Sequence, residues 1–168
     1  RGSNLNAILN YPELKNLIEI VTVVSDKIDC KAFETAKEFG ILTLTVGDGE
    51  GRIPQNSITA TLKNLEVNFI VLAGYLKLIP NDLIEIFENR IINIHPALLP
   101  SFGGKGMYGL NVHRAVFNSS AKVSGATVHM VDKTYDTGKI VAQKCIDISD
   151  VKNPEEIANR GLKNEHMI

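Results

Sequence analysis

The sequence predicts an α/β fold, with a doubly wound and mostly parallel sheet, helices on both faces and an antiparallel C-terminal part. Three observations lead to this class. Apolar, β-branched runs alternate with segments of helical spacing over the first half of the chain. Several of these runs are continuously hydrophobic, as in parallel strands that are covered on both faces. Two later runs flank a turn-rich stretch, which favours antiparallel pairing.

Strands and helices are predicted in alternation along the first part of the chain. Apolar runs predict strands over residues 18–24, 41–46, 67–72 and 91–94. Helical spacing predicts helices over residues 5–9, 32–39, 58–65 and 83–87. The order of strand, helix and strand implies right-handed crossovers between parallel strands, as in Rossmann-like domains.

The last third of the chain predicts a different pairing. Residues 123–131 and 140–148 are apolar runs on either side of a turn-rich stretch, so we expect two antiparallel strands. Asn153, Pro154 and Glu156 then supply an N-cap, a first-turn proline and an acidic third residue. These residues predict a final helix that runs toward the C-terminus.

We expect a single domain over residues 1–168, because this length allows one hydrophobic core and is short for two ordinary domains. A glycine loop such as residues 1–4 normally follows a strand, and the final helix stops without a capping glycine. We therefore expect a first strand before this sequence and further chain after it.

Composition and charge favour a small-molecule partner. Hydrophobic residues make up 44% and charged residues 22% of the sequence, as in soluble globular proteins. The 18 basic and 19 acidic residues nearly cancel and form no basic block, so nucleic-acid binding is not expected. No apolar run approaches the roughly 20 residues that span a bilayer and no signal-peptide pattern opens the sequence, so we expect a cytoplasmic protein without membrane contact. Cys30 and Cys145 lack disulfide or zinc spacing, so we expect reduced thiols and no metal.

The predicted strand over residues 91–94 carries the clearest chemical signal. It delivers Asn93 and His95 just before Pro96, and the strand period of two places both side chains on one face. Ligands of open parallel sheets gather outside the carboxyl ends of the strands. An amide N–H and an imidazolium at that place can stabilise an oxyanion that forms on a carbonyl. Taken alone, a strand-end amide and a core histidine would be the commoner explanation.

The segment NIHPALLP at residues 93–100 resembles the signature of the folate-dependent formyltransferases, with Ala97 where serine is commoner. The same resemblance extends to four further segments, RGSNL at 1–5, VLAGYLKLIP at 71–80, VHMVDKTYDTG at 128–138 and NEHMI at 164–168. It covers essentially the whole sequence, and within the family the sequence is most similar to the glycinamide ribonucleotide formyltransferases.

The resemblance implies a binding site for the ribonucleotide substrate. Backbone N–H groups at a helix start attract anions, and the family uses this loop for the substrate phosphate, which implies that role for Gly2, Ser3 and Asn4. Taken alone, the loop would be an ordinary serine or asparagine N-cap. Glu165 resembles the acidic residue that hydrogen-bonds the ribose hydroxyls. Without the family it would be a solvated helix residue.

The resemblance also implies a pterin pocket after the predicted strand at 67–72. Gly74 permits close approach of a ligand to the backbone. Main-chain groups around Lys77, Leu78 and Ile79 would pair with the ring. The family often has arginine at Lys77, and a backbone contact survives that change whereas a bidentate side-chain contact does not. Taken alone, this segment would be an ordinary loop between a strand and a helix.

Asp136 lies in an Asp-x-Gly turn and, by resemblance, is the acidic partner of His95. Such a turn at Gly138 can bend the chain back over a site, although a turn-forming aspartate is common in itself. An opposite charge nearby is expected to favour the charged form of His95 and so to raise its pKa. His129 is similar to a supporting residue of the family, and Asp132 is out of register.

The implied reaction moves a formyl group from 10-formyltetrahydrofolate, as co-substrate, to the amine of glycinamide ribonucleotide. Asn93, protonated His95 and Asp136 would form its catalytic set, without a metal. The alternatives are transfer to methionyl-tRNA, a sugar amine or water, and a folate- or nucleotide-binding module without catalysis. The glycine loop at residues 2–4 argues against other acceptors. The stretch at 101–109 is unusually glycine-rich, so we expect a mobile flap near the substrate. It lacks the GK[ST] of a nucleotide phosphate loop, so no ATP is implied. The two small molecules are the expected partners, and an oligomer is compatible with the sequence.

Overall fold

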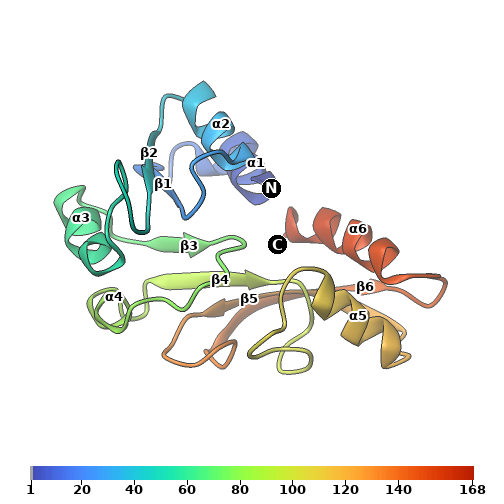
Figure 1. Ribbon diagram of the computed structural model, residues 1–168. Coiled ribbons are helices and arrows are strands. Elements are labelled where there is room, and N and C mark those ends of the chain that lie inside the picture. The colour runs from blue at the N-terminus through green and yellow to red at the C-terminus, as the bar shows by residue number, and fades with distance from the viewer. Residues whose placement is uncertain (1) are drawn as a thin grey trace. The chain divides into compact units, whose positions relative to one another are not determined.

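The computed structural model describes residues 2–168 (Figure 1). These residues form two compact units. Unit 1 runs to Phe69 and includes Pro80–Phe87, whereas unit 2 comprises Ile70–Ile79 and Glu88–Ile168. Each unit is described by itself below.

Unit 1 is a small α/β unit around a two-stranded parallel sheet. Its elements are α1 (Ser3–Asn10), β1 (Thr22–Ser25), α2 (Lys31–Glu38), β2 (Leu42–Thr45), α3 (Ile58–Asn64) and α4 (Asn81–Ile86), with short 3-10 helices at Pro12–Leu14 and Gln55–Ser57. Strand β1 pairs with β2 from Thr22 opposite Leu42 onward. Helix α2 packs on both strands and buries Phe33 and Ala36. The helix predicted over residues 32–39 is present, and Gly40 follows its C-cap with a φ of 69° and an N–H that bonds to the Lys37 carbonyl oxygen.

Unit 2 contains the larger sheet, with strand order β3-β4-β5-β6. Its elements are β3 (Ile70–Leu72), β4 (Ile91–His95), α5 (Leu110–Asn118), β5 (Val123–Met130), β6 (Ile140–Asp147) and α6 (Pro154–Glu165). Strand β3 is parallel to β4, while β5 is antiparallel to both β4 and β6. The predicted change from parallel to antiparallel pairing is therefore confirmed, and with it the α/β class.

The core of unit 2 lies where α5 and α6 meet the sheet. Val112 and Val116 of α5 and Ile157 of α6 form a buried cluster with Ala97 and Ile148, and all five are at most 2% exposed. Helix α6 packs against β5 and β6, as Figure 1 shows. No helix was predicted from the sequence at the position of α5.

The N-terminus of α6 is capped as the sequence predicts. The Asn153 side chain accepts a hydrogen bond from the Glu156 N–H at 2.9 Å, and Pro154 occupies the first turn. The Glu156 carboxylate in turn accepts from the Asn153 side chain and from the Lys152 N–H, both at 3.0 Å. This reciprocal capping satisfies N–H groups that a helix start leaves free.

Two details of the strand predictions are wrong. The apolar runs at 18–24 and 67–72 begin before their strands, because β1 starts at Thr22 and β3 at Ile70, and Ile18 and Phe69 are 48% and 45% exposed. The expectation of strands covered on both faces also fails at Leu42 and Val71, which are 46% and 49% exposed. Apolar composition alone does not distinguish a strand residue from an apolar residue in the loop before it.

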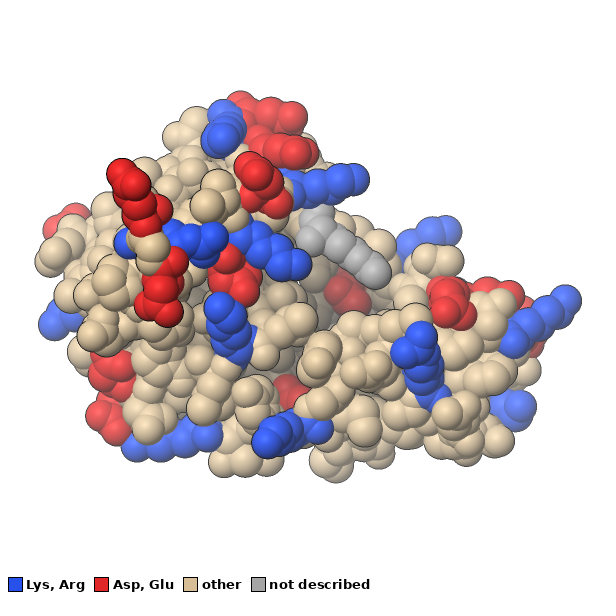
Figure 2. Space-filling view, in the orientation of Figure 1, with Lys and Arg blue, Asp and Glu red and all other residues tan. Residues whose placement is uncertain are grey.

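Acidic and basic side chains are interspersed over the face of the molecule in Figure 2, in keeping with the nearly balanced charge. Among residues 2–168, no helix is both long and apolar enough to cross a membrane.

Candidate active site

The site is built on β4 and its neighbour β5. Asn93 lies opposite His129, and His95 lies opposite Thr127, in the antiparallel register of the two strands. Directly opposed residues point to the same side of a sheet, and so do residues two apart on one strand. The predicted common face of Asn93 and His95 is thus present, and β5 adds His129 and Thr127 to it.

The His95 ring is buried, with 3% of the side chain exposed, and one nitrogen is anchored. Its Nε2 lies 2.9 Å from the Phe102 carbonyl oxygen, which can only accept, so Nε2 carries a hydrogen. Nδ1 is therefore the nitrogen that gains or loses a proton. Nδ1 lies 3.6 Å from Asp136 Oδ2, which is a charge contact longer than a hydrogen bond.

Asp136 and His129 link the rest of the cluster. The Gly104 N–H donates to Asp136 Oδ2 at 2.9 Å, while Asp136 Oδ1 lies 3.5 Å from His129 Nε2. His129 Nδ1 lies 2.8 Å from the Met130 carbonyl oxygen and donates to it. When the ring is protonated, Nε2 donates to Asp136 Oδ1, and when the ring is neutral, Nε2 accepts from Asn93 Nδ2 at 3.1 Å. This bond uses one of the two Asn93 amide hydrogens and leaves the other for a ligand.

The pKa of Asp136 lies below its ordinary value. Burial acts to raise this pKa, but the hydrogen bond with His129, the Gly104 N–H and the charges of His95 and His129 together outweigh burial. The carboxyl group is therefore ionised near neutral pH.

The pKa of His95 also lies below its ordinary value, which corrects the expectation from sequence. Burial lowers it most; the Asp136 charge and the Phe102 carbonyl raise it, and the charge of His129 lowers it further. The expected effect of Asp136 is thus present in direction, but desolvation of the buried ring outweighs it. His95 is mainly neutral near pH 7 in the free protein.

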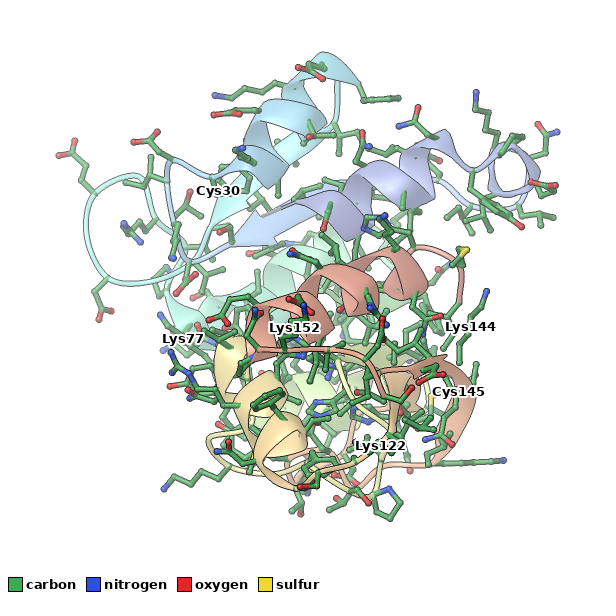
Figure 3. All side chains as sticks on the ribbon, turned by 90° about the vertical axis from the view of Figure 1, so that its right-hand side faces the viewer. Cys30, Lys77, Lys122, Lys144, Cys145 and Lys152 are labelled. Atoms are coloured by element: carbon green, nitrogen blue, oxygen red, sulfur yellow. The ribbon has the colours of Figure 1, made fainter. Side chains whose placement is uncertain are left out.

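The segment predicted to line a pterin pocket is a loop that leaves the sheet beside this cluster. Leu72, the last residue of β3, pairs with Asn93, so the loop begins level with the catalytic candidates. Gly74 has a φ of 80°, and a Cβ added there would meet no atom within 4 Å. Lys77, which Figure 3 labels, is exposed, as is Leu78, whereas Ile79 is buried.

The residues predicted to hold the ribonucleotide lie at two helix ends. Gly2, not Ser3 or Asn4, is the N-cap of α1, with a φ of 78° and no side-chain capping bond. A Cβ on Gly2 would lie 2.8 Å from the backbone nitrogen of Ala32 at the start of α2, so only glycine fits there. Glu165 is the last residue of α6 in unit 2 and is half-buried.

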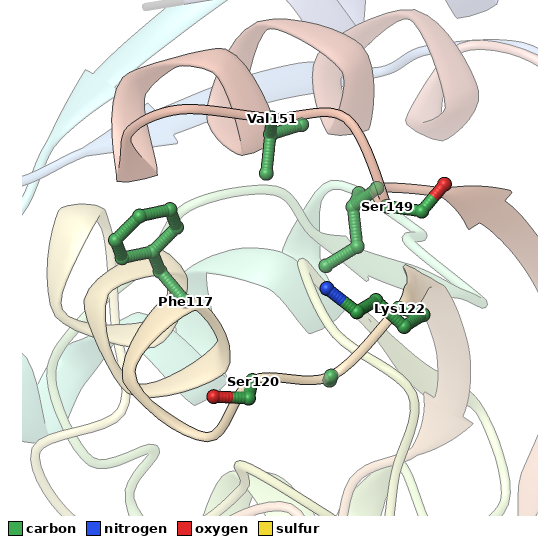
Figure 4. Close-up of a pocket in the computed structure, with 7 residues that line it drawn as sticks. Phe117, Ser120, Lys122, Ser149 and Val151 are labelled. Atoms are coloured by element: carbon green, nitrogen blue, oxygen red, sulfur yellow. The ribbon is translucent and has the colours of Figure 1, made fainter.

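One cavity of about 330 Å³ touches the Asp136 turn, and it is lined by Leu99, Pro100, Gly103, Gly104, Tyr135, Asp136, Thr137, Gly138 and Ile140. A second cavity of about 270 Å³, shown in Figure 4, lies between the end of α5 and the segment before α6. It shares no residue with the Asn93 cluster. Among the described residues, no group of three or more His, Cys, Asp and Glu side chains could hold a metal ion.

The backbone atoms that bind His95 and Asp136 could not be predicted from the sequence. The Phe102 carbonyl and the Gly104 N–H orient His95 and Asp136, but every residue has such groups, so no side-chain signal marks them. Thr127 did carry a signal, because it lies two residues before His129 on a predicted strand and so faces the same side.

A mixed α/β fold with an amide, an imidazole and a carboxylate together beside one strand end defines a protein equipped to stabilise charge on a reacting carbonyl. Comparison with known proteins gives the family. The profile described as formyl transferase matches residues 1–168, and the chain belongs to that family.

Individual relatives agree with this assignment. The chain is 44% identical over 155 residues to the chloroplastic phosphoribosylglycinamide formyltransferase of Arabidopsis thaliana, covering 89% of this chain and 53% of that protein. It is 37% identical over 170 residues to phosphoribosylglycinamide formyltransferase of Bacillus subtilis, covering 98% and 84%. The solved structure of glycinamide ribonucleotide transformylase 1 from Symbiobacterium toebii matches with a TM-score of 0.87 and 31% identity, over 99% of this chain and 78% of the other. The chain thus spans about half the length of the plant relative.

Proposed function

We propose that this chain transfers the formyl group of 10-formyltetrahydrofolate to the amine of glycinamide ribonucleotide, a step of de novo purine synthesis. One observation carries the proposal. The Asn93 amide, His95 Nδ1 and the Asp136 carboxylate converge on one face of the sheet, in a member of the formyl transferase family.

Asn93 supplies a hydrogen bond to the developing oxyanion. Attack of the neutral amine on the formyl carbon forms a C–N bond and moves the carbonyl electrons onto oxygen. One Asn93 amide hydrogen is held by neutral His129 at Nε2, and the second hydrogen would then be available to the reacting group. The fixed amide lowers the cost of reorganisation during the reaction.

Protonated His95, held beside Asp136, stabilises the negative charge of the oxyanion. The Phe102 carbonyl holds Nε2, so His95 takes up on Nδ1, beside Asp136, the proton that the amine nitrogen loses after attack. When the intermediate collapses, the C–N bond to the folate nitrogen breaks. The amine proton passes to that nitrogen, which releases tetrahydrofolate and the formylated ribonucleotide.

The binding roles follow from the same family. The start of α1 at Gly2, Ser3 and Asn4 would hold the substrate phosphate, since the positive end of the helix dipole attracts anions and α1 has no acidic residue in its first turn. Glu165 would accept from the ribose hydroxyls. The loop from Gly74 would take the pterin.

Backbone atoms of Lys77, Leu78 and Ile79 would pair with the pterin ring. This assignment does not depend on the side chain of Lys77, which is exposed.

We also place the protein in the cytoplasm, with the two small molecules as its partners. A fluorescent fusion that gathered in an organelle would contradict this location.

A single-turnover assay with each candidate acceptor tests the function. Purified protein is mixed with 10-formyltetrahydrofolate and glycinamide ribonucleotide, a sugar amine, methionyl-tRNA or buffer alone. Tetrahydrofolate should be released only with the ribonucleotide. The matched control is Asn93→Asp, which keeps the size of the side chain but removes its N–H donors. Release with buffer alone would indicate a hydrolase, and binding without release would indicate a folate-binding module.

A further inference from the structure

Two residues of the segment after β4 are buried although the segment has left the sheet. β4 ends at His95, and residues 96–100 then form a turn. Ala97 and Leu99 are 0% and 5% exposed. Buried backbone N–H and C=O groups need hydrogen-bond partners, and outside a sheet these must come from side chains or loops.

Thr127 and Gln143 supply these partners. Thr127 Oγ1 donates to the Ala97 carbonyl oxygen at 2.7 Å and accepts from the Leu99 N–H at 3.1 Å. Gln143 lies opposite Thr127 in the register of β5 and β6. Its Nε2 donates to the Leu99 carbonyl oxygen at 2.8 Å and to Thr127 Oγ1 at 3.0 Å. We call this pair of side chains the brace.

The bonds of the brace also fix the orientation of the Gln143 amide. The Thr127 hydroxyl hydrogen is used on Ala97, so Thr127 Oγ1 can only accept from Gln143. The Leu99 carbonyl oxygen is also an acceptor. Both partners therefore require the NH₂ side of the amide, and neither a carboxylate nor an apolar side chain could replace it.

Leu99 connects the brace to the catalytic groups. A Cβ added to Gly103 would lie 2.6 Å from Leu99 Cδ2 and 3.1 Å from Asp136 Cβ, so the Gly103 backbone is enclosed between these two side chains. The residues on either side of Gly103 are the ones whose backbone atoms hold His95 and Asp136, each at 2.9 Å. A shift of Leu99 would therefore change the position of both catalytic groups.

We propose that Thr127 and Gln143 are positioning residues, which fix residues 97–99 and thereby hold His95 and Asp136 in the geometry that formyl transfer requires. This inference rests on the proposed function. Both side chains act through the backbone of the segment that follows β4, without contact with substrate.

The first test replaces Gln143 by leucine, which keeps its bulk and removes both donors. Gln143 is exposed, so the fold should tolerate the change. We expect kcat to fall by about tenfold to a hundredfold, because small misplacement of reacting groups has effects of this order. KM should change little. The matched control is Cys145→Ala, an exposed position two residues along the same strand (Figure 3), which should leave kcat unchanged.

NMR titration of the His95 ring without substrate gives a second readout. The Phe102 carbonyl favours the protonated ring, so loosening that bond should move the pKa of His95 lower in Gln143→Leu than in the wild type. Thr127→Ser retains the hydroxyl and should behave as wild type, whereas Thr127→Val should resemble Gln143→Leu. A merely structural role would lower stability without moving the titration.

The outcomes separate the two proposals. If the wild type transfers formyl and Gln143→Leu matches it in kcat and in the His95 titration, the brace is refuted. If the wild type transfers formyl to no acceptor, the proposed function fails, and with it the role of the brace in formyl transfer. A lower pKa of His95 in Gln143→Leu would then still show that the brace positions His95, and an unchanged titration would refute the brace altogether.

Discussion

Replacement of Asp136 by asparagine should shift the loss of activity on the alkaline side to lower pH. The proposed reaction needs the His95 ring to be charged when the oxyanion forms, and the Asp136 charge is the larger of the two influences that raise its pKa. Without that charge, burial and the charge of His129 remain, and the pKa of His95 falls further below its ordinary value. The protonated ring is then lost at lower pH.

The expected loss of activity in Asp136→Asn follows from the distance between the His95 and Asp136 charges. His95 Nδ1 lies 3.6 Å from Asp136 Oδ2, and the side chains are 3% and 11% exposed. Two unit charges at this separation attract each other by about 1 kcal/mol in water and by about 5 kcal/mol at an effective dielectric constant of about 20. Burial places the pair between these limits. We expect kcat to fall by about a hundredfold, and more in His95→Ala, because the imidazole acts directly.

The assay combines a pH profile of kcat with NMR titration of the His95 ring. Asp132→Asn is the matched control, since Asp132 lies in the same turn region but its oxygens bond to Thr134 and Thr137. The double replacement of His95 and Asp136 should cost little more than His95→Ala alone, because the two groups act as one unit. An identical His95 pKa with and without Asp136 would refute the coupling.

Three further predictions concern binding and stability. Asn4→Ala should weaken ribonucleotide binding more than folate binding in calorimetry, and so should Gly2→Ala, although the close approach of Gly2 to Ala32 adds a folding cost. Gly74→Val should lower folate affinity. The φ of 80° at this position also adds about 1–2 kcal/mol of backbone strain to any side chain. Gly74→Ala is the control for that strain, and thermal unfolding of both variants measures it. The free energy of unfolding should decline as pH falls below about 6.5, because His95 binds a proton more readily in the unfolded chain than when it is buried. Urea unfolding at pH 7.5 and 5.5 measures this decline, which should be smaller in His95→Gln. Equal losses for both ligands, unchanged folate affinity in Gly74→Val, or an unchanged pH dependence in His95→Gln would contradict these predictions in turn.

The fold was predictable where the signal is local. Asn153 and Glu156 mark the start of α6 because capping depends on residues three apart. Helix α5 was not predicted because it follows a glycine-rich stretch that is typical of a loop. Val112 and Val116, four residues apart, do show the spacing of a buried helix face. The start of β1 after Ile18 was not predictable, because it depends on which apolar residues are buried by tertiary packing, and burial is not a local property of the sequence.

The sequence predicted that the side chains of Asn93, His95 and Asp136 lie together, but it did not predict the pKa of His95. Asn93 and His95 share a face because of the strand period, and Asp136 was found by resemblance to a family. The net pKa of His95 depends on how deeply the ring is buried and on the Phe102 carbonyl, and neither is visible in a motif. The expected direction of the His95 pKa shift is wrong because desolvation of the buried ring outweighs its attraction to Asp136.

This balance of burial against charge has a consequence for the proposed chemistry. A histidine whose pKa was raised strongly would be charged before the substrate arrived and would stabilise the free enzyme as much as the transition state. Burial keeps His95 mainly neutral, while Asp136 stays ionised next to Nδ1. The oxyanion then adds a second negative charge near Nδ1 and favours protonation of the ring at the moment when the intermediate forms. The pair therefore stabilises the charged intermediate more than the ground state, which is the condition for lowering a barrier.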